Sequence, residues 1–502
     1  MSPSDRRDFL KRLGLTGAGA LGLSGCAAPS DPPPDGNAVS VTGRVTAPDG
    51  GVANVPVTDG ITVTTTDGDG HFHFTASARQ PFVHLSVPAG YRLPTNENGL
   101  RRGYRPLDAG SGDSMTVSFD LTRLDRDDTH HAFVFLADPQ ARTEAEMEEF
   151  RRTTIPDVTD TVQALGDRPV FGVGGGDLVF DTLSLFSEYE TAVQDTRLPF
   201  VQVVGNHDLN VDASGDPGST ATFRTHFGPT YYSFDRGAVH YVVLDDVYWP
   251  GSDGFGEATD SYLGHLDTAQ LHWLRQDLAL VEDGRPVIVL AHIPPLSTMY
   301  ERRDEPRPSP RNMIVNREAL HDLLAPFDAH IVTGHIHENE HRFADGPHEH
   351  VVGTACGAWW TGPICYDGTP RGYVVYEVDG ASVQWRYKST GREADHQMRL
   401  TVPDGDRLVA NVWDADDAWT ITWFEEGLRK GELTQTRGLA PRARTLYAGE
   451  EQPEKYDWVE PQPTDHLFTA PYNPKANRIR VEATDRFGRT YTASLGTASN
   501  PS

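Results

Sequence analysis

The chain has 502 residues, of which 37% are hydrophobic and 9% aromatic. This length allows two to four domains, and the composition suffices for packed cores, which argues against global disorder. Asp and Glu outnumber Lys and Arg by 72 to 44, giving a net charge of −28. A nucleic-acid-binding protein normally carries a basic surface, so no nucleic-acid complex is expected.

The first 26 residues have the features of an export signal. Arg6 and Arg7 precede Asp8-Phe9-Leu10-Lys11, and a small, apolar run at 13–25 leads to Cys26. That run is too short to span a bilayer. The segment resembles a twin-arginine signal ending in a lipobox, which implies export by that route and a lipid on Cys26. The alternative is a plain secretory signal with an incidental cysteine.

The predicted mature chain begins with a Pro-rich tether at 27–37, followed by a β-rich domain at 38–125. Residues 39–45 and 61–66 alternate between apolar and polar side chains, and 71–74 resume the alternation after a turn. This pattern predicts short strands and a small β-sandwich, and it resembles transthyretin-like accessory modules. Asp67 and Asp69 in the turn are interpreted as hairpin residues, with a calcium site as the alternative.

The pattern changes at 126–390, where continuous apolar runs alternate with helical stretches. Such runs are typical of strands buried on both faces, and the alternation indicates an α/β domain. Strands are predicted at 132–137, 169–173, 200–204, 239–244, 286–291 and 330–333, and helices at about 143–165, 267–282 and 316–326. Asn316 is the expected N-cap of the last helix.

The remaining residues, 391–502, return to β patterning and predict a third, β-rich domain. Strands are expected at 398–402, 408–413, 420–423, 479–483 and 490–492, and the Pro-rich stretch 451–463 is expected to be a surface loop. Cys356 and Cys365 lie in the preceding domain. If the chain is exported, they could form a disulfide, or they could be two unpaired buried thiols.

Polar residues follow the apolar strands of the α/β domain at five successive positions, which is where open α/β sheets place ligands. Each block alone is weak evidence, but five in order make coincidence a poor explanation. The blocks are Asp138-Pro139-Gln140, Gly176-Asp177, Gly205-Asn206-His207-Asp208, His292 and Gly334-His335-Ile336-His337.

These blocks resemble those of the calcineurin-like metallophosphoesterase superfamily, in a bacterial subfamily with N-terminal and C-terminal β-rich accessory domains. The resemblance implies a central four-layer α/β/β/α core and two divalent metal ions, Mn, Fe or Zn. It makes Asp177 the bridging carboxylate. Asp138, Gln140 and His337 would complete one metal site, and Asn206, His292 and His335 the other.

By the same resemblance, His207 acts as the general acid and Asp208 orients it, while hydroxide bound to the metals attacks phosphorus. One block departs from the usual pattern. Gln140 stands where a histidine is usual, and an amide oxygen is the weaker ligand, so the first metal site is expected to bind less tightly or to prefer Mn or Mg. Asp-Pro-Gln also occurs in some members of the superfamily.

Several other residues are weaker candidates. Asp181 is expected to cap or orient its loop. Trp359, Trp360, Tyr231 and Tyr232 are candidates for the substrate pocket, with core packing as the alternative. The histidines at 341, 348 and 350 are expected to lie in a solvated loop, with metal binding as the alternative.

The sequence therefore predicts a lipid-anchored, extracytoplasmic phosphoesterase that hydrolyses a phosphate mono- or diester. Membrane contact is expected through the lipid anchor only. Two rivals remain. The first is a non-catalytic cell-surface protein that binds phosphorylated polymers, which only Gln140 favours. The second is a structural envelope lipoprotein, which the five strand-end blocks disfavour.

Overall fold

The computed structural model describes residues 38–107, 114–251, 262–306, 308–343, 346–403, 405, 407–449, 455–456 and 458–496. The predicted export signal, Cys26 and the tether lie outside these residues. Within the described part of the chain, none of the helices combines the length and apolar character needed to cross a bilayer.

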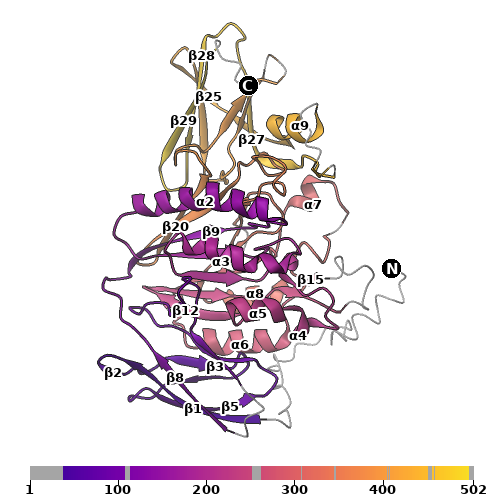
Figure 1. The fold of residues 1–502 in the computed structure, drawn as a ribbon. Helices are drawn as coiled ribbons and strands as arrows, with labels where there is room; N and C mark the ends of the chain where they lie inside the picture. The colour runs from indigo at the N-terminus through magenta and orange to yellow at the C-terminus, as the bar shows by residue number, and fades with distance from the viewer. Residues whose placement is uncertain are drawn as a thin grey trace, which may run out of the picture. The chain divides into compact units, whose positions relative to one another are not determined.

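The N-terminal region consists of two four-stranded sheets (Figure 1). One contains β1 (Ala38–Ala47), β2 (Gly50–Gly51), β5 (His71–Ser77) and β8 (Ser114–Asp120). The other contains β3 (Pro56–Thr58), β4 (Val63–Thr65), β6 (Phe82–Leu85) and β7 (Tyr104–Pro106). Buried residues of both sheets belong to one hydrophobic core. In the first sheet, alternate residues of β1 and β5 face inward. In the turn before β5, the Asp67 carboxylate accepts hydrogen bonds from the backbone of Asp69 and His71, as the hairpin interpretation predicts.

The central region contains two larger sheets. The first has the order β11-β10-β9-β20-β21, and the second β12-β13-β16-β17-β19-β18. The strands of the first are β9 (His130–Leu136), β10 (Val170–Gly175), β11 (Phe200–Val203), β20 (Gly372–Asp379) and β21 (Ser382–Ser389). Those of the second are β12 (Tyr232–Arg236), β13 (Val239–Val243), β16 (Pro286–Leu290), β17 (Asp328–Thr333), β18 (Glu340–Arg342) and β19 (His348–Val351). A separate short pair joins β14 (Val247–Tyr248) to β15 (Leu263–Gly264).

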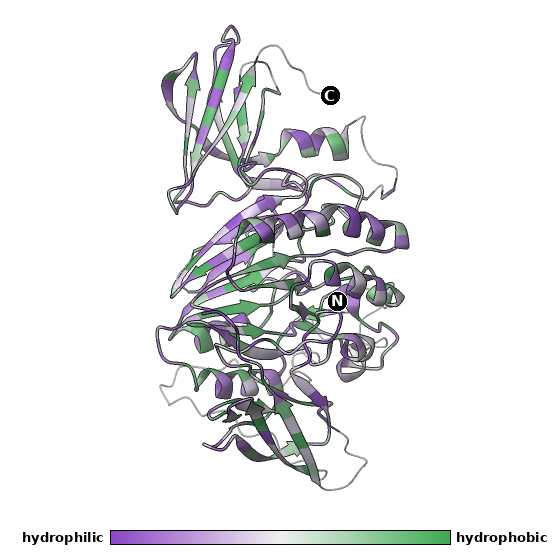
Figure 2. Cartoon of the chain, turned by 60° about the vertical axis from the view of Figure 1, so that its left-hand side comes forward, coloured by the Kyte–Doolittle hydropathy of each residue, from purple (hydrophilic) through white to green (hydrophobic). Residues whose placement is uncertain are grey.

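The two central sheets pack against each other through aromatic side chains. The ring of Phe133 on β9 lies edge-on to Tyr241 on β13, with centroids 5.6 Å apart, and stacks on Tyr376 at 4.5 Å. Phe171 on β10 lies 5.4 Å from Phe234 on β12. These rings are buried within a single hydrophobic core. Burial on both faces explains why the strands are continuous apolar runs in the sequence, and Figure 2 shows hydrophobic residues along them.

Helices contribute to a second core, on the other faces of the central strands. They are α2 (Glu144–Ala164), α3 (Phe186–Gln194), α5 (Ala221–Phe227), α6 (Thr268–Leu278) and α8 (Arg317–Leu324), with the short α4 (Asp216–Ser219) and α7 (Met299–Arg302). Thr143 and Glu146 form a capping box at the start of α2. Asn316 occupies the N-cap position of α8 but does not cap it, because its amide instead bonds the backbone of Leu266.

The C-terminal region has two four-stranded sheets, of order β22-β23-β27-β26 and β25-β24-β28-β29. Their strands are β22 (Arg399–Thr401), β23 (Arg407–Asn411), β24 (Thr420–Glu425), β25 (Leu428–Glu432), β26 (Thr434–Leu439), β27 (Pro463–Pro471), β28 (Arg478–Thr484) and β29 (Thr490–Gly496). A helix that the sequence pattern did not predict, α9 (Pro441–Ala448), follows β26. The described structure thus has an α/β core with β-rich regions on both sides in the sequence.

Hydrogen bonds join both β-rich regions to the core. The Gln276 side chain donates to the Ile61 carbonyl at 2.7 Å, and the Tyr231 hydroxyl donates to the Gly60 carbonyl at 2.8 Å. On the C-terminal side, Asn339 donates to the Trp413 carbonyl at 2.8 Å. The accessory regions are therefore bonded to the core, and the core's strand ends determine the candidate site.

Candidate metal centre

Parallel strands bring the predicted ligands together. β9, β10 and β11 run parallel in the first sheet, and β13, β16 and β17 run parallel in the second. Parallel strands have their carboxyl ends at the same edge, so residues just after these strands meet there. The residues concerned are Asp138 after β9, Asp177 after β10, Asn206 after β11, His292 after β16 and His335 after β17.

One group of donors surrounds Oδ1 of Asp177. His292 Nε2 lies 3.3 Å from this oxygen, 3.2 Å from Asn206 Oδ1 and 3.2 Å from His335 Nδ1. One ligand atom from each of Asp177, His292 and His335 lies within 4.8 Å of the others. Two imidazoles, a carboxylate and an amide oxygen form the donor set that Mn, Fe or Zn accepts.

A second group lies beside the other oxygen of Asp177. The Gln140 amide donates to Asp177 Oδ2 at 3.0 Å, and His337 Nε2 lies 3.5 Å from Asp138 Oδ1. Asp138 also accepts a hydrogen bond from the backbone of His335 at 3.0 Å. Asp177 Oδ1 therefore belongs to the first group, whereas Oδ2 accepts the Gln140 amide hydrogen bond on the side of Gln140.

Backbone carbonyls orient the two buried histidines. His292 Nδ1 lies 3.0 Å from the Gly175 carbonyl, and His337 Nδ1 lies 2.7 Å from the Gly357 carbonyl. Each Nδ1 is thus occupied, and Nε2 is directed at the carboxylates. Metal-binding histidines are commonly held in this way, because the hydrogen bond determines both the tautomer and the ring orientation.

The site also concentrates unusual backbone geometry. Positive φ angles, which cost energy in residues other than glycine, occur at Asp138 (46°), Gln140 (44°), Asp177 (47°), His335 (73°) and His337 (53°). Strain of this kind persists where the surrounding structure imposes it, and it is common at functional sites. At this site the strained turns direct the side chains of the candidate ligands toward one another.

The electrostatics favour a cation at this position. Asp138 and Asp177 are almost fully buried, at 0% and 1% exposure. Burial by itself would raise the pKa of Asp177, but His292 and His207 outweigh it and hold the pKa below its ordinary value. Burial likewise opposes the charge on His292, yet Asp177 raises its pKa to about 10. Buried carboxylates demand positive charge here, and the donor set fits divalent metal ions.

His207 is paired with Asp181 and not with Asp208. Its Nδ1 lies 2.7 Å from Asp181 Oδ1, and its backbone N–H donates to Asp177 Oδ1 at 2.8 Å. The ring packs edge-on against Phe180 and remains 20% exposed. Burial opposes protonation, but Asp177 and Asp181 raise the pKa of His207 above its ordinary value. Asp181, and not the Asp208 predicted for this role, therefore holds the His207 ring.

Asp208 holds the loop backbone. Its carboxylate accepts hydrogen bonds from the N–H groups of Gly205 (2.9 Å), Leu178 (3.2 Å) and Val179 (3.2 Å). Burial, with a smaller contribution from Asp177, raises its pKa to about 8. Asp208 thus ties the turn after β10 to the turn after β11, and positions Asp177 and Asn206 relative to each other.

The four aromatic candidates for the substrate pocket have different surroundings. Trp359 is half-buried and lies 4.9 Å from the His337 ring, beside the metal-ligand group. Trp360 is 7% exposed, and its indole N–H donates to the Pro139 carbonyl at 2.9 Å, so it supports the turn after β9. Tyr231 contacts Trp273 and bonds Gly60, and Tyr232 packs under Arg101, so both serve contacts between the core and the N-terminal region. Of the four, Trp359 is the one whose ring lies against the candidate ligand His337.

Two buried residues at the site had no assigned role in the sequence. Cys356 Sγ lies 3.6 Å from Gln140 Oε1 and 3.7 Å from His337 Nδ1. Asp246 accepts hydrogen bonds from the backbone of His292 and Ile293, and so orients the turn after β16. Asp246 follows strand β13 in the sequence, and that position was a signal that could have identified it. Cys356 and Cys365 are both free and buried, so of the two alternatives left open by the sequence the structure has two unpaired thiols.

The His341, His348 and His350 side chains are not in a solvated loop. They lie on β18 and β19, in a buried cluster beside the ring of Trp385.

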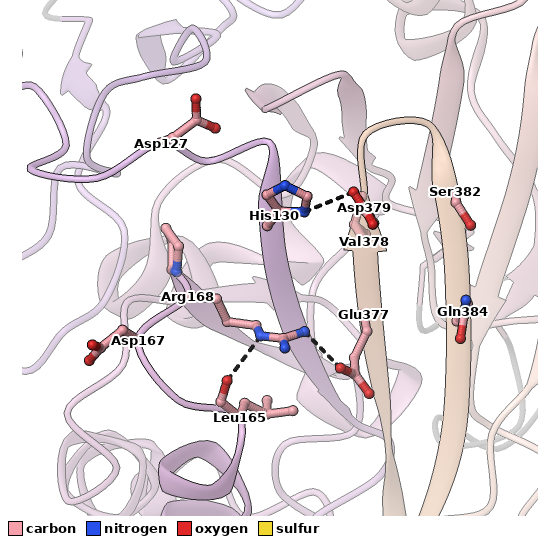
Figure 3. Close-up of a pocket in the computed structure, with 11 residues that line it drawn as sticks. Asp127, His130, Leu165, Asp167, Arg168, Glu377, Val378, Asp379, Ser382 and Gln384 are labelled. Carbon is pink, nitrogen blue, oxygen red and sulfur yellow. Dashed lines mark hydrogen bonds and ion pairs between the residues drawn. The ribbon is translucent and has the colours of Figure 1, made fainter. Parts of the chain in front are cut away.

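A separate pocket of about 520 Å³ (Figure 3) is lined in part by His130, Arg168 and Asp379. It lies at the amino end of β9, the opposite end of that strand from Asp138, and is therefore distinct from the metal-ligand groups.

Three family models match the chain in succession. Residues 39–124 match the N-terminal part of calcineurin-like phosphoesterase, residues 128–339 match calcineurin-like phosphoesterase itself, and residues 349–491 match its C-terminal part. Together these matches account for nearly all of residues 39–491. The central match contains the strand-end ligands, and the flanking matches contain the two β-rich regions.

Individual relatives match this chain at low sequence identity and over only part of its length. Purple acid phosphatase 23 of Arabidopsis thaliana is 26% identical over 159 residues, covering 29% of this chain and 30% of that protein. A probable cyclic nucleotide phosphodiesterase of Psychrobacter arcticus is 22% identical over 176 residues, covering 34% and 58%. The chain thus spans less than two thirds of either relative. The structure of purple acid phosphatase PPD1 from yellow lupin (Lupinus luteus) aligns with a TM-score of 0.36 at 14% identity, covering 67% of each chain. On the three successive family matches, the chain belongs to the calcineurin-like phosphoesterases with N-terminal and C-terminal companion domains.

Proposed function

We propose that this protein is a metal-dependent hydrolase of phosphate mono- or diesters. The observation that carries this proposal is the buried group of Asp177, His292 and His335, whose ligand atoms lie within 4.8 Å of one another. The Asp177 carboxylate of this group also accepts the backbone N–H of His207 and the amide of Gln140. Family membership supports the same activity. In this proposal Asp138, Gln140, Asp177 and His337 hold one divalent ion, and Asp177, Asn206, His292 and His335 hold the other.

Two divalent ions, when bound, neutralise the phosphate and supply an activated water nucleophile near neutral pH. The chain's own residues provide the remaining functions. Asp181 holds Nδ1 of His207, which leaves Nε2 as the nitrogen that can reach a substrate. A proton on Nε2 passes to the leaving alkoxide as the P–O bond breaks. The partial exposure of His207 gives an ester access to this nitrogen.

The leaving-group side of the site has an apolar, aromatic wall. Phe180 packs on His207 at 4.4 Å and lies 6.4 Å from Trp359. We place the ester's organic group against these rings, since stacking and exclusion of water favour aromatic or apolar groups there. Trp359 is thus proposed as a substrate-pocket residue, whereas Trp360, Tyr231 and Tyr232 have structural roles.

We also propose an extracytoplasmic location for this activity, with a lipid on Cys26 as the membrane anchor. Its support is the order of the twin arginines, the apolar run and the lipobox in the sequence. The core is proposed to be a four-layer α/β/β/α arrangement, on the evidence of the shared aromatic core between its sheets and the helical core beyond them. The N-terminal sheets are proposed to be a β-sandwich.

The proposed function is tested by turnover of a panel of aryl phosphate mono- and diesters after removal of metal and reconstitution with Mn, Fe or Zn. The wild-type chain is expected to hydrolyse at least one class only when metal is present. His207→Ala should lower kcat roughly 10²- to 10⁴-fold while leaving bound metal unchanged, since general acids contribute about that much. A wild-type chain that binds metal and turns over none of the panel would instead support a phosphate-polymer binding protein.

A further inference from the structure

A second group of metal-ligand atoms lies away from the strand-end site, between the core and the C-terminal region. His341 on β18 and His350 on β19 are direct cross-strand partners, and Asp414 follows β23. One ligand atom of each residue lies within 4.8 Å of the others. The side chains are 1%, 0% and 3% exposed, respectively.

The distances suit a small cation. Asp414 Oδ1 lies 3.0 Å from His341 Nε2 and 3.9 Å from His350 Nε2. Ligands about 2.0–2.1 Å from a tetrahedral zinc ion stand about 3.3 Å apart. Asp414 Oδ1 is thus slightly closer to His341 Nε2, and about 0.6 Å farther from His350 Nε2, than in such a site, so the side chains must shift to bind one ion.

One buried nitrogen in this group has no hydrogen-bond partner. His350 Nε2 is fully buried and unpaired, although it faces the Asp414 carboxylate. Leaving such an atom unsatisfied is costly, so a native structure usually provides it with a partner. A metal ion between His350 and Asp414 would satisfy this nitrogen.

The other ends of the ligands are held in place. His350 Nδ1 lies 2.6 Å from the Tyr376 hydroxyl, and His341 Nδ1 lies 3.1 Å from His348 Nε2. Asp414 Oδ2 accepts the backbone N–H of Tyr387 at 3.1 Å. Each ligand therefore directs its remaining donor atom at the common centre, because the hydrogen bond at its other end fixes its orientation.

The charge balance also suits a divalent ion. A neutral imidazole has the lone pair that a metal binds. Asp414 is a buried carboxylate whose Oδ1 faces both histidine nitrogens and also accepts a hydrogen bond from Asn339 at 3.2 Å, and it would supply the anionic ligand.

We propose that His341, His350 and Asp414 bind a structural transition-metal ion of the zinc class, independent of the strand-end site. Among the described residues, these three are the protein ligands, and solvent would complete the coordination. A cavity of about 600 Å³ lined in part by His341, Arg342 and Asp416 lies on that side. Because Asp414 belongs to the C-terminal region, the ion joins this region to the β18–β19 edge of the core.

The test is metal stoichiometry of the full chain in an Asp177→Asn background, which weakens the strand-end site. After chelator treatment, Zn²⁺ or Co²⁺ is added, and bound metal is measured by mass spectrometry and by Co²⁺ visible absorption. The background variant should keep one tightly bound ion with intense, tetrahedral-type Co²⁺ bands. Adding Asp414→Asn should remove that ion and lower its apparent affinity at least 100-fold.

The matched control is Asp416→Asn, which removes a buried carboxylate two residues away and should leave the ion bound. His350→Gln is the second test variant, in case Asp414→Asn does not fold, with folding checked by circular dichroism. Zinc should also raise the Tm of the background and Asp416→Asn chains but not that of the His350→Gln chain. Equal stoichiometry and equal Co²⁺ spectra in folded Asp414→Asn or His350→Gln chains would overturn the proposal.

Discussion

The Asp181 carboxylate lies 2.7 Å from Nδ1 of His207, and it comes from the turn after a different strand. This contact leaves Nε2 of His207 directed away from Asp181, on the side where an ester could bind. The neighbouring Asp208, adjacent in sequence, contacts three backbone N–H groups of the surrounding turns. The two carboxylates therefore have separate roles, and separate variants can distinguish them.

Asp181→Asn is expected to lower kcat about 10-fold or more, with a larger loss for alkyl than for aryl phosphate esters, because a poor leaving group needs the proton of His207 more. The measurement is kcat for a series of esters with graded leaving-group pKa. Bound metal should not change. Asp195→Asn, which removes an exposed carboxylate paired with Arg151, serves as the control. An equal loss across all leaving groups would contradict an acid-positioning role.

Gln140→His is expected to raise the affinity for one metal ion about 10-fold, since imidazole is the stronger ligand for Mn, Fe or Zn. In the present structure the Gln140 amide donates to Asp177 Oδ2, so the new ring would replace this contact at the edge of the site. Competition titration with a chromogenic chelator measures the change. Unchanged affinity and stoichiometry would place residue 140 outside the metal's ligands.

Gly176→Ala is expected to abolish binding at the strand-end site. Gly176 has φ +86°, and an added Cβ would lie 2.4 Å from the His292 ring nitrogen. Gly166→Ala is the matched control, because Gly166 has a similar φ of +76° but open space around it. Backbone strain should cost both chains about 1–2 kcal/mol of stability, but only Gly176→Ala adds a clash with His292 and should lose strand-end metal. Equal metal loss in both would show that strain alone is responsible.

His240 should make the protein's stability depend on pH. It is buried between Asp235 and Asp277, each 2.9 Å from a ring nitrogen. Burial opposes its charge, but the two carboxylates raise the pKa from 6.5 to about 9. A raised folded-state pKa stabilises the fold below the unfolded value of 6.5, and this stability is lost as pH rises through about 9. The difference of about 2.5 pKa units corresponds to roughly 3 kcal/mol.

The check compares urea unfolding of the wild-type chain and His240→Gln at pH 6, 7.5 and 9.5. The free energy of unfolding of the wild-type chain should exceed that of His240→Gln most at pH 6, and this difference should shrink toward pH 9.5. His73→Gln changes an exposed histidine of β5 and is the control for the loss of an imidazole. A gap between wild type and His240→Gln that is the same at every pH would show that this histidine is not charged in the folded state.

Much of the site was predictable because its ligands follow strands. Asp138, Asp177, Asn206, His292 and His335 each come directly after an apolar run that forms a buried parallel strand. Strand identity is a local property, and parallel pairing then brings the ends to one edge. The positions of these residues along the chain were therefore sufficient to predict that they meet.

The partner of His207 was not predictable in this way. Asp208 is its neighbour in sequence and Asp181 is 26 residues away, so proximity along the chain favoured the incorrect partner. The 3₁₀ turn η2 (Asn206–Asp208) directs adjacent side chains in different directions, and only the packing of the two turns determines which carboxylate reaches the ring.

Burial of polar residues was equally hard to predict. The segment 341–350 has three histidines among polar residues, a composition typical of a surface loop, yet His341 and His350 lie on the paired strands β18 and β19 with buried side chains. Tyr232 similarly packs under Arg101 of the N-terminal region. In both cases the covering residues come from another region of the chain, so no local pattern indicates them.

The sequence by itself determined which residues end the buried strands, and hence which ligands the strand-end site contains, because strand formation depends on local apolar patterning. Only the tertiary structure decided which carboxylate holds His207, which aromatic side chain lies beside His337, and that His341 and His350 meet Asp414. Those contacts join residues far apart in the sequence, and they depend on how turns and domains pack against each other.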